Sequence, residues 1–295
     1  AIPNEYDRLY QSMGSTYLNA HTWYEETVYK VGLPSNRLEQ WAMVETERFR
    51  SPVYRLFQPE LEIVYEEKNR AMDNKERIIN EVVDKALFKV HPYGQQTGLG
   101  TVEHLKNPSL RNIHEFYEAY YVPANMAIIV AGDIQADKAI KVIDRHFGRL
   151  PKGDLPKPKT WDEPPFDGIE RVEATYEGEE KVIIAFRTVP NHHPDAAAVT
   201  IADELLDNRS AGLMNRLVQR QEVREASASR MLLNDHGGEQ FEGVPKKGQT
   251  LEEVEALLLA QIETLKKGDF DEELIDAIVN NEKKKKKSGM EKIIV

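Results

Sequence analysis

A strand-like run, a turn residue and then a helix-like run follow one another four times along this chain, and this recurring unit constrains the fold more than any other feature. The strand-like runs are residues 27–31, 126–131, 181–186 and 241–244, and the helix-like runs after them are residues 38–49, 137–147, 196–206 and 250–265. In the fourth unit, Thr250 with Glu253 three residues later is the signature of a capping box.

Two further helical stretches interrupt this rhythm. One covers residues 59–89 and is expected to break near Asp73 and Asn74, and the other covers residues 107–121, with Asn107 as its cap and Pro108 in its first turn. Strands and many helices without strict alternation favour an α+β layer architecture over a doubly wound sheet.

A Pro-rich stretch near the middle of the 295-residue chain predicts two domains. Residues 150–158 and 163–165 carry prolines that can neither continue a helix nor sit in a central strand, so they indicate a semi-rigid linker. We place the first domain at residues 1–155, the linker at 156–168 and the second domain at 169–295. The shorter second domain and the absence of an initiator Met suggest a segment of something longer, clipped at both ends.

The charge balance argues against a nucleic-acid partner. Fifty Asp and Glu against 39 Lys and Arg give a net charge of −11, whereas phosphate binding needs a surplus of cations on one face. The basic run Lys283 to Lys287 is typical of a solvated helix face, and we assign it no role. No apolar run approaches the roughly 20 residues of a membrane span, so we expect a soluble protein. The absence of Cys leaves the bacterial periplasm and the cytoplasm equally open.

Histidine spacing completes no metal motif. None of the eight His residues stands four positions from another, as two zinc ligands on one helix face would. Glu60 and Glu67 are more informative, because a seven-residue spacing puts them within about 20° of each other around a helix axis. They share that stripe with Ile63, so a solvated helix edge and a functional pair both fit the pattern.

Short motifs occur in a fixed order along nearly the whole chain. They are Asn19-Ala20-His21-Thr22 followed by Thr27-Val28-Tyr29, Glu60 to Glu67, His91-Pro92-Tyr93-Gly94 with Gly100-Thr101, Tyr120 to Met126, Gly132-Asp133 and, more weakly, Ser210 to Leu217. The ordered set resembles the pitrilysin/insulinase zinc metallopeptidases of the inverted His-x-x-Glu-His type. The resemblance implies two similar α+β domains, each a mostly antiparallel sheet with helices packed on one face, ferredoxin-like and similar to mitochondrial processing peptidase.

The resemblance also implies a zinc endopeptidase. In this family two His and a downstream Glu bind Zn²⁺, while the Glu inside the motif acts as general base. The downstream ligand falls on Glu67, and the supporting catalytic carboxylate falls on Glu60. Asn19, Ala20, His21 and Thr22 match the edge strand to which a peptide substrate adds as a further strand, although an ordinary edge strand fits the same residues.

Two departures from the family pattern limit what this chain can do. The His-x-x-Glu-His helix is absent, so we expect that the chain alone neither holds zinc tightly nor cleaves peptides. The assisting Arg and Tyr of active relatives correspond to Gln219 and Ala226 here. The second domain is therefore expected to be non-catalytic, with assisting residues supplied by a second half or subunit of the same family.

The sequence thus indicates part of a zinc endopeptidase that cleaves oligopeptides or short unfolded polypeptides inside a chamber. Two other interpretations stay open. One is a non-catalytic structural or assembly subunit of the same superfamily, against which the retention of both Glu60 and Glu67 counts. The other is a peptide-binding module that uses the edge at residues 19–22.

Overall fold

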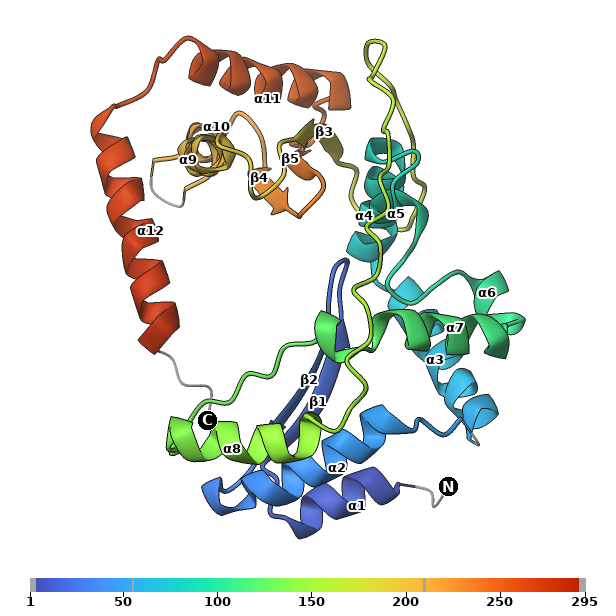
Figure 1. The fold of residues 1–295 in the computed structure, drawn as a ribbon. Coiled ribbons are helices and arrows are strands. Elements are labelled where there is room, and N and C mark those ends of the chain that lie inside the picture. Colours follow the sequence, from blue (N-terminus) through green and yellow to red (C-terminus); the bar gives the residue numbers. More distant parts are fainter. Residues whose placement is uncertain (1–3, 55, 209–210, 292–295) are drawn as a thin grey trace. The chain divides into compact units, whose positions relative to one another are not determined.

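The computed structural model describes residues 4–54, 56–208 and 211–291, and it divides into two compact units (Figure 1). The first unit contains the described residues up to Arg77 together with 96–162. The second contains 78–95 and the described residues from Glu163 onward. The division does not follow chain order, because a segment from the first third of the chain belongs to the second unit.

The first unit combines a β-hairpin with helices. Its elements are α1 (Glu5–Ser12), β1 (Tyr17–Thr22), β2 (Thr27–Gly32), η1 (Ser35–Arg37), α2 (Leu38–Arg50), α3 (Phe57–Met72), the start of α4 (Lys75–Leu87), α6 (Val102–Lys106), α7 (Leu110–Tyr120), η2 (Pro123–Asn125) and α8 (Ala136–Phe147). β1 and β2 pair antiparallel, with Asn19 opposite Lys30 and Thr22 opposite Thr27. α2 packs on α8, where the rings of Trp41 and Phe147 have centroids 5.6 Å apart.

Glu45 of α2 organises a buried polar cluster in the first unit. Its carboxylate accepts hydrogen bonds from Tyr10, from Tyr6 at 2.8 Å and from Arg48 Nε at 2.9 Å, and the residue is only 4% exposed. Burial and the contact with Glu45 raise the pKa of Tyr10. The Arg48 guanidinium also lies over three aromatic rings, those of Tyr6, Tyr29 and Phe49. A buried charge is tolerable here because every partner is present.

The prediction of a strand at residues 126–131 is wrong. Among the described residues this run pairs with no other segment, and Ile129 is 90% exposed. The apolar pattern is that of a strand, but a strand needs a hydrogen-bonded neighbour, and none of the described segments supplies one.

The predicted start of the helix at Asn107 is also wrong. α6 ends at Lys106, and α7 begins after Ser109, whose side chain caps the Asn112 N–H at 3.2 Å. Pro108 is the physical reason, because the residue before a proline is pushed out of the helical region. Asn107 accordingly has φ −139° and ψ 62°. The break predicted near Asp73 and Asn74 is confirmed, since α3 ends at Met72 and α4 begins at Lys75.

The second unit is built on a three-stranded antiparallel sheet in the order β3-β5-β4. Its elements are the rest of α4, α5 (Pro92–Gln95), β3 (Val182–Thr188), α9 (Ala196–Leu206), α10 (Leu213–Gln219), β4 (Glu225–Leu232), β5 (Gly237–Val244), α11 (Leu251–Lys266) and α12 (Glu273–Glu291). The α+β class with antiparallel sheets is confirmed. The capping box of α11 is present, with the Thr250 hydroxyl and the Glu253 carboxylate each accepting the other residue's N–H.

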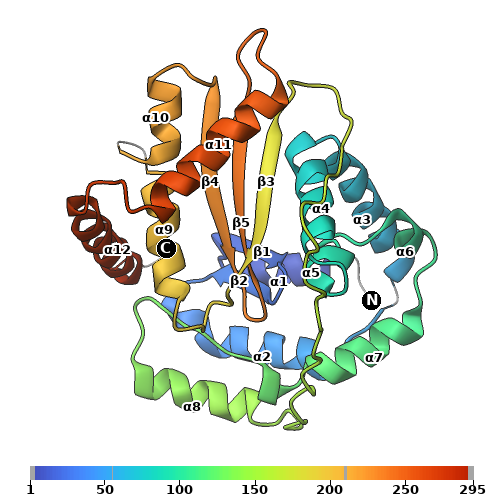
Figure 2. The same cartoon turned by 90° about the horizontal axis from the view of Figure 1, so that it is seen from above.

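One face of this sheet packs against α10 and α11, and Figure 2 shows α11 running across the strands. The core there contains Phe241 of β5 with Leu213, Met214 and Leu217 of α10 and Val254 and Leu258 of α11. Gly243 allows α11 to approach closely, because a Cβ at this position would lie 2.5 Å from Val254 Cγ1.

The opposite face of the sheet packs against α4 and the turn that follows it. Ile183 and Ala185 point away from the α11 side and contact a cluster that contains Ile79, Val83, Leu87, Phe88, Tyr93 and Leu233. The second unit therefore has helix, sheet and helix layers. No helix in the described ranges is both long and apolar enough to cross a membrane.

Glu239 is a buried carboxyl on the α9 side of β5. Burial, with neighbouring Asp203 as the next cause, raises its pKa to about 8. Arg230 pairs with Asp203, and Glu239 Oε1 has no hydrogen-bond partner. Near neutral pH this raised pKa favours the protonated form of Glu239, which lies beside Asp203 and Arg230.

Replacing Glu45 with Ala should destabilise the first unit. The variant leaves the half-buried Arg48 without its anion and two tyrosine hydroxyls without their acceptor, which should lower the free energy of unfolding by about 3 kcal/mol. Urea denaturation followed by circular dichroism measures the loss. Glu47→Ala, which removes an exposed ion pair with Arg50, is the matched control and should change stability little. Equal effects of the two variants would contradict the importance of the cluster.

Replacing Glu239 with Gln should stabilise the second unit in alkaline solution. The folded pKa of about 8 lies above the unfolded value of 4.5, so the folded state holds a proton that the unfolded state has lost between these values. The free energy of unfolding therefore falls as pH rises from 4.5 and levels off above 8. Gln removes this decline, and at pH 9 we expect a gain of roughly 2 kcal/mol. Urea denaturation at pH 5 and pH 9 measures the free energy of unfolding of each variant. Glu177→Gln, at an exposed position, is the control.

Candidate functional site

Glu60 and Glu67 lie on one exposed stripe of α3. Pro59 and Glu60 occupy the first turn of this helix and Arg70 its last, which suits the helix dipole. Both glutamates are exposed, and neither side chain has a hydrogen bond or ion pair within the described part of the chain. Ile63, on the same stripe, is 56% exposed. Glu60, Ile63 and Glu67 therefore form an exposed stripe whose carboxylates have no partner among the described residues.

The described residues do not form a zinc site by themselves. Zinc takes three or four protein ligands, whereas residues seven apart on a helix are separated by about 10.5 Å along its axis. Glu60 and Glu67 therefore cannot be joint ligands of one ion. Across residues 4–54, 56–208 and 211–291, no group of three His, Asp or Glu side chains is placed to hold a metal.

The predicted peptide-binding residues lie on β1. Asn19, Ala20, His21 and Thr22 are all exposed, and β2 is the one strand that pairs with β1 in the described structure. The Asn19 Oδ1 accepts the Ala20 N–H at 2.8 Å, and His21 Nε2 lies 3.3 Å from Glu26 Oε1. The structure shows no hydrogen bond or ion pair between the described residues of β1 and the α3 glutamates.

Gln219 and Ala226 line one surface pocket of about 430 Å³ in the second unit. Asn215, Val218, Glu225, Ser227 and Glu242 complete its lining. An amide and a methyl group thus stand where the resemblance assigns an Arg and a Tyr. Neither can supply a cation or a phenolic hydroxyl to a reacting carbonyl.

The weak motif from Ser210 to Leu217 is explained by packing. Ser210 itself lies outside the described residues, but Leu213, Met214 and Leu217 form the buried face of α10. Gly212 precedes the helix where a Cβ would lie 2.4 Å from Asn215 Oδ1. This motif therefore builds the core and the helix start rather than a catalytic surface.

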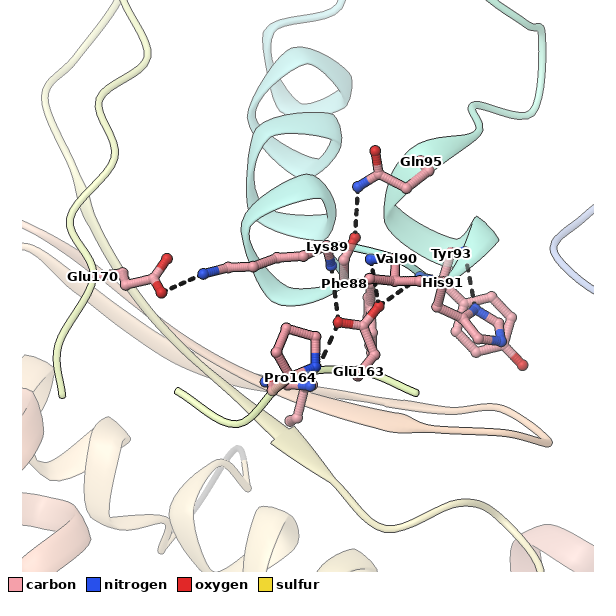
Figure 3. Close-up of polar contacts among 10 residues, drawn as sticks. Phe88, Lys89, Val90, His91, Tyr93, Gln95, Glu163, Pro164 and Glu170 are labelled. Carbon is pink, nitrogen blue, oxygen red and sulfur yellow. Dashed lines mark hydrogen bonds and ion pairs between the residues drawn. The ribbon is translucent and has the colours of Figure 1, made fainter. Parts of the chain in front are cut away.

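Glu163, which lies in the expected linker, was not predicted to have a role. The Glu163 side chain is 2% exposed, and its carboxylate accepts three consecutive backbone N–H groups, from Lys89 at 3.0 Å, Val90 at 2.8 Å and His91 at 2.5 Å (Figure 3). Burial raises the pKa of this carboxyl, but the three backbone donors and Arg187 outweigh it, and the net result is a lowered pKa. Its only sequence signal is a lone acid before two prolines.

His91, from the His-Pro-Tyr-Gly motif, belongs to the same region. It is 3% exposed, its Nδ1 accepts the Tyr93 N–H at 3.1 Å, and its Nε2 lies 3.1 Å from Asp235 Oδ2. The ring of His236 meets it edge to face at 5.2 Å. Burial and the nearby His91 lower the pKa of His236. The motif thus joins the α4–α5 turn to the β4–β5 turn.

Comparison with known proteins decides the family. Residues 109–282 match the sequence profile described as "Peptidase M16 inactive domain". The chain belongs to the M16 peptidase family. The zinc protease PqqE of Helicobacter pylori (strain ATCC 700392 / 26695) is 26% identical over 294 residues, which are 95% of this chain and 64% of that protein. The probable zinc protease PqqL of Escherichia coli (strain K12) is 25% identical over 166 residues, 54% of this chain and 18% of that protein.

Solved M16 structures share the fold. The crystal structure of a protease from Helicobacter pylori matches with a TM-score of 0.84 at 24% identity, over 98% of this chain and 71% of that one. The first half of the periplasmic protease PqqL from Escherichia coli matches with a TM-score of 0.72 at 19% identity, over 95% and 63%. The chain therefore spans less than two thirds of the length of these curated relatives, and residues 109–282 are of the type named inactive within the M16 family.

Proposed function

We propose that this chain is part of an M16 zinc endopeptidase and contributes one metal ligand, Glu67, to a zinc site whose other ligands come from a His-x-x-Glu-His segment. The observation that carries the proposal is the α3 stripe, where Glu60, Ile63 and Glu67 are exposed and the carboxylates have no partner among the described residues. A first-row divalent metal accepts carboxylate oxygen readily, and covering Ile63 would offset the cost of ordering the two surfaces.

Each residue has a distinct role in this proposal. Glu67 would supply an anionic oxygen to the metal, and Glu60, one helical repeat earlier, would orient a neighbouring ligand or substrate group rather than bind the ion. When bound, zinc would polarise a scissile carbonyl and acidify its water. The chain's own residues would hold the ion and position the peptide, but the residues described here include no general base placed beside Glu67.

The substrate would bind as an added strand along β1, at Asn19 to Thr22. Main-chain hydrogen bonds to an exposed edge tolerate many sequences, so the substrate class would be oligopeptides or short unfolded polypeptides. The "inactive" description of residues 109–282, with Gln219 and Ala226 in place of Arg and Tyr, supports a non-catalytic role for the second domain at 169–295. Assisting groups would then come from another half or subunit of the family.

A non-catalytic assembly subunit is the second candidate, and the same "inactive" description favours it. The two functions differ in what they require of α3. An assembly subunit needs only the shape of the exposed stripe, whereas a peptidase needs its charge at Glu67.

Glu67→Gln should therefore abolish peptide hydrolysis in a polypeptide that joins this chain to the His-x-x-Glu-His segment. Zinc affinity should fall by more than the roughly 10–100-fold expected for Glu60→Gln, because a direct ligand is lost rather than a supporting group. Zinc content by atomic absorption and turnover of a fluorogenic peptide are the measurements. Glu66→Gln, an exposed neighbour on another helix face, is the matched control. Unchanged zinc content in Glu67→Gln would refute the ligand assignment and favour the assembly subunit.

Ala20→Pro should weaken peptide capture by this chain without any metal. Proline removes one edge N–H and disfavours strand addition, so the chemical-shift changes that an extended peptide causes at residues 19–22 should shrink at least severalfold. Lys159→Pro, at an exposed position outside any helix or strand, is the control. Equal peptide binding by the wild type and Ala20→Pro would exclude β1 as the substrate edge.

A further inference from the structure

The turn of the β1–β2 hairpin determines which backbone groups of β1 face its free edge (Figure 1). The Trp23 N–H donates to the Glu26 carbonyl at 2.8 Å, which extends the ladder by one pair beyond β1. Amides alternate in direction along a strand, so Ala20, three residues before Trp23, directs its N–H away from β2. The structure agrees, because the Asn19 Oδ1 accepts the Ala20 N–H at 2.8 Å. The free edge therefore offers backbone groups at alternate residues of β1.

The same alternation gives the hairpin two different faces. On one face, Tyr29 packs on Phe49 of α2, with ring centroids 5.7 Å apart. Tyr29 stands opposite Ala20, so Ala20 shares this face. We call the other side of the hairpin the open face. It carries the remaining alternate residues of β1 and the residue that follows them, which are all exposed: Tyr17, Asn19, His21 and Trp23.

Tyr17 and Trp23 are the large side chains at the two ends of this open face. Tyr17 is 48% exposed and stands opposite Gly32, which has no side chain to cover it. Trp23 is 59% exposed, and its ring centroid lies 5.9 Å from that of Tyr24 in the turn. The two residues are six positions apart, or about 20 Å at the rise of an antiparallel strand. Aromatic residues stabilise strand pairs when aromatic or β-branched side chains stand opposite them.

A peptide added along β1 would place its own alternate side chains beside the open face. Residues directly opposite on neighbouring strands have Cβ atoms about 4.5–5.5 Å apart, which is contact distance for large side chains. The peptide residues opposite Tyr17 and Trp23 must themselves be six positions apart, whether the peptide runs parallel or antiparallel to β1. Between them the face presents Asn19 and His21, whose Nε2 lies 3.3 Å from the Glu26 carboxylate. Polar peptide residues suit these two middle positions.

We propose that Tyr17 and Trp23 select extended peptides that carry aromatic or β-branched residues six positions apart, with polar residues at the two alternate positions between them. Each matched pair adds one cross-strand contact, which raises affinity by up to about fivefold. This inference rests on the proposed function, because it takes β1 as the edge that receives the peptide. It goes further by naming the side-chain pattern of the substrate.

Two peptides of identical composition test the proposal with the whole chain. Both are fluorescein-labelled nine-residue peptides of Ser, Gln and Lys with two Tyr residues, which stand at positions 2 and 8 in the first peptide and at positions 2 and 7 in the second. Only the first peptide can place both Tyr side chains on the open face, because residues five apart lie on opposite faces of a strand. Its Kd should therefore be about fivefold lower. Fluorescence anisotropy measures both dissociation constants.

Variants of the chain show which residues discriminate between the two peptides. Trp23→Ser and Tyr17→Ser should each bring the ratio of the two dissociation constants to about one, because a single aromatic residue then remains for either peptide. Trp23→Phe should keep the ratio, since it retains an aromatic ring. Phe116→Ser, at a residue of α7 that is 57% exposed in the same unit, should match the wild type. A ratio that survives in both serine variants would overturn the selection by Tyr17 and Trp23.

Ala20→Pro distinguishes failure of this inference from failure of the proposed function. If the wild type binds both peptides equally and Ala20→Pro weakens both, β1 receives the peptide but the two aromatic residues select nothing. If Ala20→Pro weakens neither peptide, the substrate edge and the selection both fall. Sedimentation velocity at the same concentration shows whether a second copy of the chain occupies β1. A dimer that binds neither peptide would also overturn the inference.

Discussion

The sheet β3-β5-β4 has two apolar faces, and covering both of them determines how the second unit is built. The α11 side is covered by α10 and α11, which come from the same stretch of chain as the strands. The other side is covered by α4 and its turn, which come from the first third of the chain. Because burying apolar area is the main favourable term in folding, this packing takes precedence over the order of the chain. It makes 78–95 part of the second unit and brings Glu163, His91 and Asp235 together.

Much of the fold was predictable from local patterns. The helices at 38–50, 136–147, 196–206 and 251–266 follow apolar periodicity and caps, and the expected strands at 27–31 and 181–186 are present. β4 escaped prediction because Glu225–Leu232 alternates small polar and apolar residues of weak strand propensity. The strand predicted at residues 126–131 is absent for a different reason. Its composition is that of a strand, but pairing is a property of the neighbour as well as of the segment.

The candidate site was also predictable only in part. Helical periodicity alone is enough to place Glu60 and Glu67 on one stripe, because a spacing of seven residues fixes an angle on any α-helix. The role of that stripe came from the family resemblance, which the M16 profile confirms as a family assignment. The contacts of Glu163 and His91 could not be predicted from the sequence. No local rule connects a residue before two prolines with three amides more than 70 positions earlier.

Gly243 affects the distance between β5 and α11. A Cβ at this position would meet Val254 Cγ1 at 2.5 Å and Leu258 Cδ1 at 3.0 Å, so a missing methyl group determines how near α11 lies to β5. A larger residue would press on the side chains of Val254 and Leu258 and loosen the packing around Phe241. Position 243 therefore tolerates few side chains, because the absence of a Cβ there allows α11 to pack directly on β5.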